Sequence, residues 1–99
     1  MINCLIIDDD PLIRDLIKHF CSKLNWVASC WSVEDGNQGI QAISSQKFDL
    51  IFLDYNLPDL TGRDLLNLIS KDIAVIMVTT EEKFGAASYE YAQIVDFLV

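Results

Sequence analysis

Three aspartates that follow apolar runs are the residues of this sequence best placed to do chemistry. Asp8 and Asp9 follow residues 2–7, and Asp54 follows residues 48–53. Unit charges about 4 Å apart repel by roughly 4 kcal/mol per pair at an effective dielectric constant near 20, so three converging carboxylates need a cation. Oxygen ligands with no nearby His or Cys favour a hard divalent ion. If the fold brings the three aspartates together, they predict a Mg²⁺ site.

Each of these acids also has a simpler structural explanation. A single Asp at this kind of position is more often a helix cap or a solvated strand-end acid, and for Asp10 the capping role is preferred. Thr79 and Thr80 close a later apolar run. A hydroxyl there could donate to an anion in the same crevice, although a Thr at a strand end is more often structural.

Five apolar runs alternate with amphipathic stretches and predict the strands that would position these residues. The expected strands are residues 2–7, 26–31, 48–53, 73–78 and 94–99. The runs are continuous, with no apolar and polar alternation, which is typical of strands buried on both faces of a parallel sheet.

Helical patterns fill the connections between these runs. Asp10 can cap a first helix that has Pro11 at its first position. Thr61 with Asp64, and Ser32 with Asp35, resemble capping boxes that open a third and a second helix. The first helix has an apolar stripe made of Leu12, Ile13, Leu16, Ile17, Phe20 and Leu24.

The inward residues of the second and third helices are expected to be Ile40, Ile43, Leu65, Leu66, Leu68 and Ile69. A fourth helix over residues 83–91 is a weaker expectation, because Gly85, Ser88 and two tyrosines are poor helix formers.

The order of elements predicts an α/β fold with a doubly wound, five-stranded parallel sheet. Such sheets bind ligands at the carboxyl ends of their strands, where the strand order reverses. In the strand order 2-1-3-4-5, the first and third strands are neighbours, so Asp8, Asp9 and Asp54 would share one crevice.

Composition limits the classes of protein to consider. The 99 residues are 52% hydrophobic and carry a net charge of −8. The chain is long enough for one small domain, and its acidity argues against nucleic-acid binding by this segment. No apolar run approaches the roughly 20 residues of a membrane span, and no signal peptide is recognised. Three cysteines without metal-ligand spacing are expected to be reduced core thiols of a cytoplasmic protein.

Three separated segments resemble the receiver domain of bacterial response regulators, a fold also called CheY-like or flavodoxin-like. They are Leu5-Ile6-Ile7-Asp8-Asp9-Asp10, Leu53-Asp54-Tyr55-Asn56-Leu57-Pro58-Asp59-Leu60-Thr61-Gly62 and Val78-Thr79-Thr80. The resemblance covers the whole chain, in order and with suitable spacing. Residues 95–99 are similar to the final strand of receivers, with a slight resemblance to regulators that have a LytTR-type DNA-binding output.

The resemblance implies a role for particular residues. Asp54 would be the phosphoacceptor, and Asp8 and Asp9 would bind Mg²⁺ together with Asp54 and the backbone carbonyl of Asn56. Thr79 would be the switch hydroxyl, and Phe97 the aromatic that turns inward when Thr79 engages phosphate.

In the loop after the third strand, Pro58 and Gly62 would shape the path into the third helix. Asn56 and Glu81 would line the approach of hydrolytic water and tune how long the signal lasts, although Glu81 is equally well explained as surface charge.

The function that the resemblance implies is a phospho-accepting signalling switch in a two-component phosphorelay. Its partner would be a sensor histidine kinase, and its output would be control of transcription through a domain outside this sequence. Because the transfer would be self-catalysed and stoichiometric, the chain is expected to be a switch and not an enzyme. No membrane contact is expected.

One departure from the family pattern concerns the end of the chain. Receivers place a lysine directly after the last strand and then a fifth helix, whereas this sequence stops at Val99. We therefore expect residues 1–99 to be a receiver domain truncated at its C-terminus. An apolar face left without that helix would favour self-association.

Two other functions remain open from the sequence. A phosphohydrolase of the haloacid dehalogenase type also has an Asp-x-Asp after its first strand, which Asp8 and Asp10 match, and Thr79 fits its later Thr. There Asp8 would be the nucleophile. Pro11-Leu12 and the short chain argue against it. The second alternative is a non-phosphorylated interaction module on the receiver fold.

Overall fold

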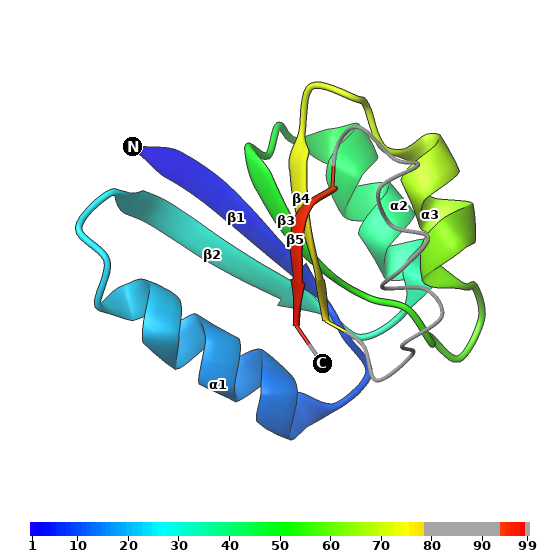
Figure 1. Cartoon of the computed structure of the whole chain (residues 1–99), viewed down its shortest axis with the longest axis horizontal. Coiled ribbons are helices and arrows are strands. Elements are labelled where there is room, and N and C mark those ends of the chain that lie inside the picture. Colours follow the sequence, from blue (N-terminus) through cyan, green and yellow to red (C-terminus); the bar gives the residue numbers. More distant parts are fainter. Residues whose placement is uncertain (79–93, 99) are drawn as a thin grey trace.

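The predicted parallel sheet is present, with strand order β2-β1-β3-β4-β5. The computed structural model describes residues 1–78 and, for residues 94–98, the backbone of the last strand. Every pair of neighbouring strands runs parallel. The order reverses between β1 and β3, as the sequence predicted, and Figure 1 shows the two strands side by side.

The strands and helices lie close to the expected ranges. The strands are β1 (Ile2–Ile7), β2 (Val27–Val33), β3 (Leu50–Asp54), β4 (Ala74–Val78) and β5 (Ile94–Leu98). The helices are α1 (Pro11–Ser22), α2 (Gly36–Ser45) and α3 (Gly62–Leu68). The predicted helix over residues 83–91 lies outside the described residues. Within the described part of the chain, no helix is long and apolar enough to cross a membrane.

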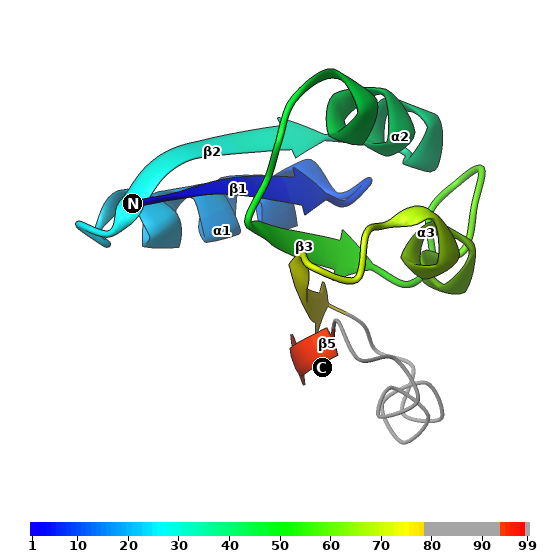
Figure 2. The ribbon, with the colours of Figure 1, turned by 90° about the horizontal axis from the view of Figure 1, so that it is seen from above.

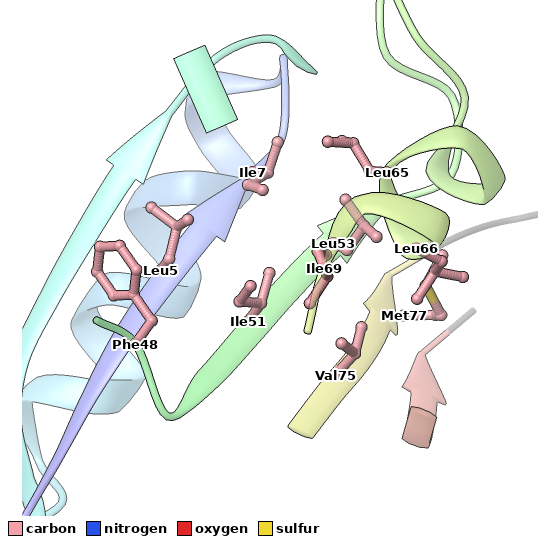
Figure 3. Close-up of a cluster of buried hydrophobic side chains, with 10 residues drawn as sticks. All are labelled: Leu5, Ile7, Phe48, Ile51, Leu53, Leu65, Leu66, Ile69, Val75 and Met77. Carbon is pink, nitrogen blue, oxygen red and sulfur yellow. The ribbon is translucent and has the colours of Figure 1, made fainter. Parts of the chain in front are cut away.

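The larger core lies between the sheet and the pair α2 and α3. Figures 1 and 2 place these two helices on one side of the sheet and α1 on the other. Figure 3 shows the buried side chains of this core, which come from β1, β3 and β4, from α3 and from the segments next to β3 and α3. The cluster is Leu5, Ile7, Phe48, Ile51, Leu53, Leu65, Leu66, Ile69, Val75 and Met77.

The opposite face is covered by α1 over β1 and β2. Its buried cluster is smaller and consists of Cys4, Ile6, Ile17, Cys21 and Phe52. Leu16 and Phe20 of the predicted apolar stripe are each 63% exposed. They border an apolar groove of about 590 Å³ that extends from α1 across β3 to β4. Among the described residues, the α1 stripe is therefore only partly buried.

Two details of the helix predictions were wrong. The N-cap of α2 is Asp35, whose carboxylate accepts a hydrogen bond from the Gln38 N–H, while Ser32 lies within β2 and does not cap the helix. Leu68 is 62% exposed, because it lies on the outer side of the short α3.

Other helix predictions were confirmed. Asp10 caps α1 with Pro11 in its first turn, and Thr61 and Asp64 form a capping box at α3.

Candidate functional site

Asp8, Asp9 and Asp54 come together at the carboxyl ends of β1 and β3. Ile7 pairs with Leu53 in the sheet, so the chain leaves both strands side by side. One carboxylate oxygen from each of the three aspartates lies within 4.8 Å of the others. Asp8 is buried, Asp54 is half-buried and Asp9 is exposed. The site is therefore open to solvent on the Asp9 side and closed on the Asp8 side.

Asp8 is held by its own chain and by the first helix. Its Oδ1 accepts a hydrogen bond from the Asp10 N–H at 2.9 Å. The Arg14 Nη1 donates to the Asp8 backbone carbonyl at 2.7 Å. Burial raises the pKa of the Asp8 carboxyl, and the Asp10 N–H opposes that rise. These contacts fix the loop between β1 and α1 beside the site.

Asp54 is the most strongly perturbed acid of the cluster. Its pKa is raised to about 7, mainly by burial and also by the nearby Asp8 and Asp9 charges, while a hydrogen bond from the Asn56 N–H opposes the rise. That N–H lies 3.3 Å from Asp54 Oδ1. Without a cation, this side chain is therefore costly to ionise at neutral pH.

The donor set fits a small divalent cation. Two oxygens that bind one Mg²⁺ at about 2.0–2.1 Å can be at most about 4.2 Å apart. The separation of up to 4.8 Å is close to that limit, so a small side-chain rotation or a bridging water would complete the geometry. At this spacing each pair of ionised carboxylates repels by about 3–4 kcal/mol at an effective dielectric constant near 20, which a divalent charge would offset.

The loop between β3 and α3 closes tightly on itself. The Gly62 N–H donates to the Tyr55 carbonyl at 2.6 Å, and Asn56 forms an isolated bridge with Thr61. A Cβ atom on Gly62 would lie 2.8 Å from the Tyr55 Cα, so only glycine fits without movement of the backbone. This supports the prediction that Gly62 shapes the loop.

The same loop is tied to α2 by Asp59. Its Oδ1 accepts from the Gly36 N–H at 2.8 Å, and its Oδ2 accepts from the Asn37 N–H at 2.9 Å. The Gly36 N–H, with burial opposing it, holds the pKa of Asp59 below its ordinary value. Pro58 is exposed beside it. The segment that carries Asn56 is thus held by contacts within the loop and by contacts with α2.

Some predicted site residues cannot be placed. Thr79 and Glu81 lie outside the described residues. Phe97 lies in β5, where its backbone pairs with Met77, but its side chain is outside the described part. Their roles stay predictions.

Two residues at the site were missed from the sequence. Arg14 and Asp59 act through tertiary contacts, with partners 6 and 22–23 positions away. An arginine one turn into a helix that follows the acidic pair was the available signal for the first. For Asp59, only its place in the loop after Asp54 could have drawn attention.

A doubly wound parallel sheet with an acidic cluster at its switch point is the kind of fold and site that receiver domains have. The sequence profile described as the response regulator receiver domain matches residues 4–99. This chain belongs to that family, whose members are signalling switches of two-component systems.

Individual relatives agree with this assignment. The chain is 33% identical over 84 residues to the chemotaxis protein CheY of Pseudomonas aeruginosa, an alignment that covers 80% of this chain and 67% of the relative. It is 32% identical over 89 residues to the sensory transduction protein LytR of Staphylococcus epidermidis, covering 87% of this chain but only 35% of that protein. The chain thus spans about a third of the length of the LytR relative.

A solved structure confirms the fold. The response regulator domain of Thermotoga maritima CheB superimposes with a TM-score of 0.85 at 29% identity, covering 100% of this chain and 78% of that one.

Proposed function

We propose that this chain is a phospho-accepting switch in which Asp54 takes a phosphoryl group from a sensor histidine kinase. The observation that carries the proposal is the convergence of Asp8, Asp9 and Asp54 within 4.8 Å of one another. Asp8, Asp9, Asp54 and the Asn56 carbonyl would hold a Mg²⁺ ion. When bound, that ion would neutralise negative charge on the phosphoryl oxygens.

In the proposed transfer, an Asp54 carboxylate oxygen attacks the phosphorus of a phosphohistidine in line with the leaving nitrogen. The new P–O bond forms as the P–N bond breaks, and the imidazole nitrogen keeps the electron pair and takes up a proton. Asp8 stays next to Asp54 because the Asp10 N–H and Arg14 fix its side chain and backbone. The product is an acyl phosphate on Asp54.

The added phosphoryl charge would act through residues further along the chain. It adds about −1.5 to −2 charge units at the end of β3. We propose that it attracts the Thr79 hydroxyl and that Phe97 then turns inward. A local charge would thereby shift the equilibrium between two conformations of the surface. The readout would be transcription control by an output domain outside this sequence.

The chain is proposed to act as a switch and not as an enzyme, because one acceptor side chain takes one phosphoryl group. The assignment of residues 1–99 to one receiver domain and the cytoplasmic location expected from the sequence stay predictions. The absence of contacts with nucleic acid or membrane also stays a prediction.

The haloacid dehalogenase alternative receives no support from Asp10. In that reading Asp10 would be the second acid of the Asp-x-Asp motif, yet its Oδ1 accepts a hydrogen bond from the Leu12 N–H at 2.9 Å as the cap of α1. Asp10 is therefore engaged in capping, as the simpler explanation expected. A Mg²⁺ titration distinguishes the other alternative, a non-phosphorylated interaction module, from the proposed switch.

A Mg²⁺ titration with and without beryllofluoride, a mimic of the phosphoryl group, tests the proposal. We expect Mg²⁺ to bind and the mimic to bind only when Mg²⁺ is present. Binding of the metal but never of the mimic would support the interaction module. Steady release of phosphate from a phosphoester by the purified protein would support the phosphohydrolase. Asp54→Asn is expected to abolish binding of the mimic.

A further inference from the structure

The three cysteines, which are well separated in the sequence, converge in the fold. Cys4 of β1 and Cys30 of β2 are register partners on neighbouring strands. Cys21, in the last turn of α1, is buried with Cys4 in the smaller core, and Cys30 packs against that cluster. All three are free thiols. Three elements therefore each bring a thiol to the same place, at the smaller core.

Cys21 is a neighbour of both other thiols. The pKa of Cys4 is raised to about 11, mainly by burial and also by the neighbouring Cys21. The pKa of Cys30 is raised to about 12, again mainly by burial and also by the neighbouring Cys21. Because Cys21 touches each of the two strand cysteines, it is the shared partner of both.

The three thiols differ in their access to solvent. Cys4 is fully buried, whereas Cys30 is half-buried. A pocket of about 190 Å³ is lined by Cys21 and Cys30, whereas Cys4 and Cys21 both line the larger groove beside α1. Lys18 also lines this pocket, and its charge favours the thiolate form of Cys30. A small reagent can therefore reach the Cys21 and Cys30 pair from the surface.

We propose that Cys21 and Cys30 form an oxidation site that closes into an intramolecular disulfide when the oxidant is a small peroxide. This site is separate from the proposed phosphoryl site and does not depend on it. In the first step a Cys30 thiolate attacks a peroxide oxygen, the O–O bond breaks and Cys30 sulfenic acid forms. The departing hydroxide takes up the proton that the thiol released and becomes water. In the second step the Cys21 sulfur attacks the Cys30 sulfur, the S–O bond breaks, and water leaves with the Cys21 proton.

The electron balance closes with the peroxide alone. Two thiols lose two electrons and two protons, and one hydrogen peroxide molecule becomes two water molecules. The reaction is slow, because little Cys30 is in the reactive thiolate form at neutral pH. The product ties the last turn of α1 to β2 and closes a short loop in the unfolded chain.

The test uses hydrogen peroxide on the whole chain, followed by alkylation and tryptic mapping without reduction. Cleavage after Arg14, Lys18, Lys23 and Lys47 places Cys4, Cys21 and Cys30 in separate peptides, 1–14, 19–23 and 24–47. We expect a species in which peptides 19–23 and 24–47 are joined, and dithiothreitol should separate them. The melting temperature of the oxidised protein should rise by about 5–15 °C.

Matched variants separate this pair from the other combinations. Cys4→Ala keeps both pocket thiols and should still form the cross-link, whereas Cys30→Ser and Cys21→Ser should not. Circular dichroism of each variant confirms that it is folded before oxidation. Three results would each overturn the proposal: a cross-link between peptides 1–14 and 19–23, cross-links only between molecules, and free thiols at Cys21 and Cys30 after prolonged exposure to peroxide.

Discussion

Gly62 packs directly against the backbone of Tyr55, the residue that follows the proposed phosphoacceptor. A Cβ atom on Gly62 would meet the Tyr55 Cα at 2.8 Å and the Asp54 carbonyl at 3.1 Å. Both obstacles are backbone atoms, which cannot rotate away as a side chain can. The entrance to α3 therefore sets the shape of the loop that leaves Asp54.

Gly62→Ala is predicted to destabilise the fold by about 1–3 kcal/mol, the usual range for overpacking. Denaturant unfolding followed by circular dichroism measures it. Gly39→Ala is the matched control. Its Cβ would meet the Ile7 Cδ1 at 2.8 Å, which is the end of a side chain that can move. Alanine in place of glycine also stabilises a helix by up to about 1 kcal/mol. A Gly62→Ala variant as stable as the Gly39→Ala variant would contradict the backbone argument.

Asp59→Ala is predicted to weaken Mg²⁺ binding by about tenfold, because the loop that carries Asn56 loses its anchor on α2. Isothermal titration calorimetry provides the measurement. Asp35→Ala serves as the control: it removes a carboxylate from the same helix end and lowers stability by about 1 kcal/mol, but it leaves the loop attached. Equal Mg²⁺ affinities for the two variants would show that Asp59 only caps the helix.

The pH dependence of stability follows from Asp54. Its pKa is raised from 3.8 to about 7 in the folded chain, so its contribution to stability is largest below about pH 4 and is lost as the pH rises through about 7. In metal-free buffer we expect Asp54→Asn to be more stable than the wild type at pH 8. Mg²⁺ should raise the wild-type melting temperature more at pH 8 than at pH 5. Equal Mg²⁺ effects at the two pH values would argue against a shared cation.

The groove beside α1 is predicted to promote self-association at high protein concentration. Leu16 and Phe20 line it and are each 63% exposed, whereas Leu12 is 74% exposed but lies outside it. Sedimentation velocity should show association that Phe20→Ser weakens and Leu12→Ser leaves unchanged. A wild-type chain that stays monomeric at every concentration tested would contradict the prediction.

The sheet and the acidic cluster were predictable because their signals are local. Continuous apolar runs define parallel strands, and an acid directly after a run must lie at the carboxyl end of that strand. Asp8, Asp9 and Asp54 therefore needed only the correct strand order to converge. The capping box formed by Thr61 and Asp64 was equally predictable from the sequence, since its two residues are three positions apart.

What the sequence could not predict depends on contacts between elements. The Ser32 prediction failed because β2 continues to Val33 and leaves Asp35 as the cap of α2. The hydrogen bonds from α2 to Asp59 and the convergence of the three cysteines both depend on how helices and strands pack. The exposure of Leu68 likewise follows from the placement of the short α3, which its apolar spacing did not reveal.

The most direct test of the account is the site of phosphoryl transfer. The whole chain is incubated with Mg²⁺ and a labelled small-molecule phosphodonor, and the labelled residue is mapped by mass spectrometry. We predict one hydroxylamine-labile phosphoryl group per chain, on Asp54, which requires Mg²⁺ and disappears in Asp54→Asn, while Asp35→Asn still takes it up. Undiminished labelling of Asp54→Asn, or a label on Asp8, would contradict the account.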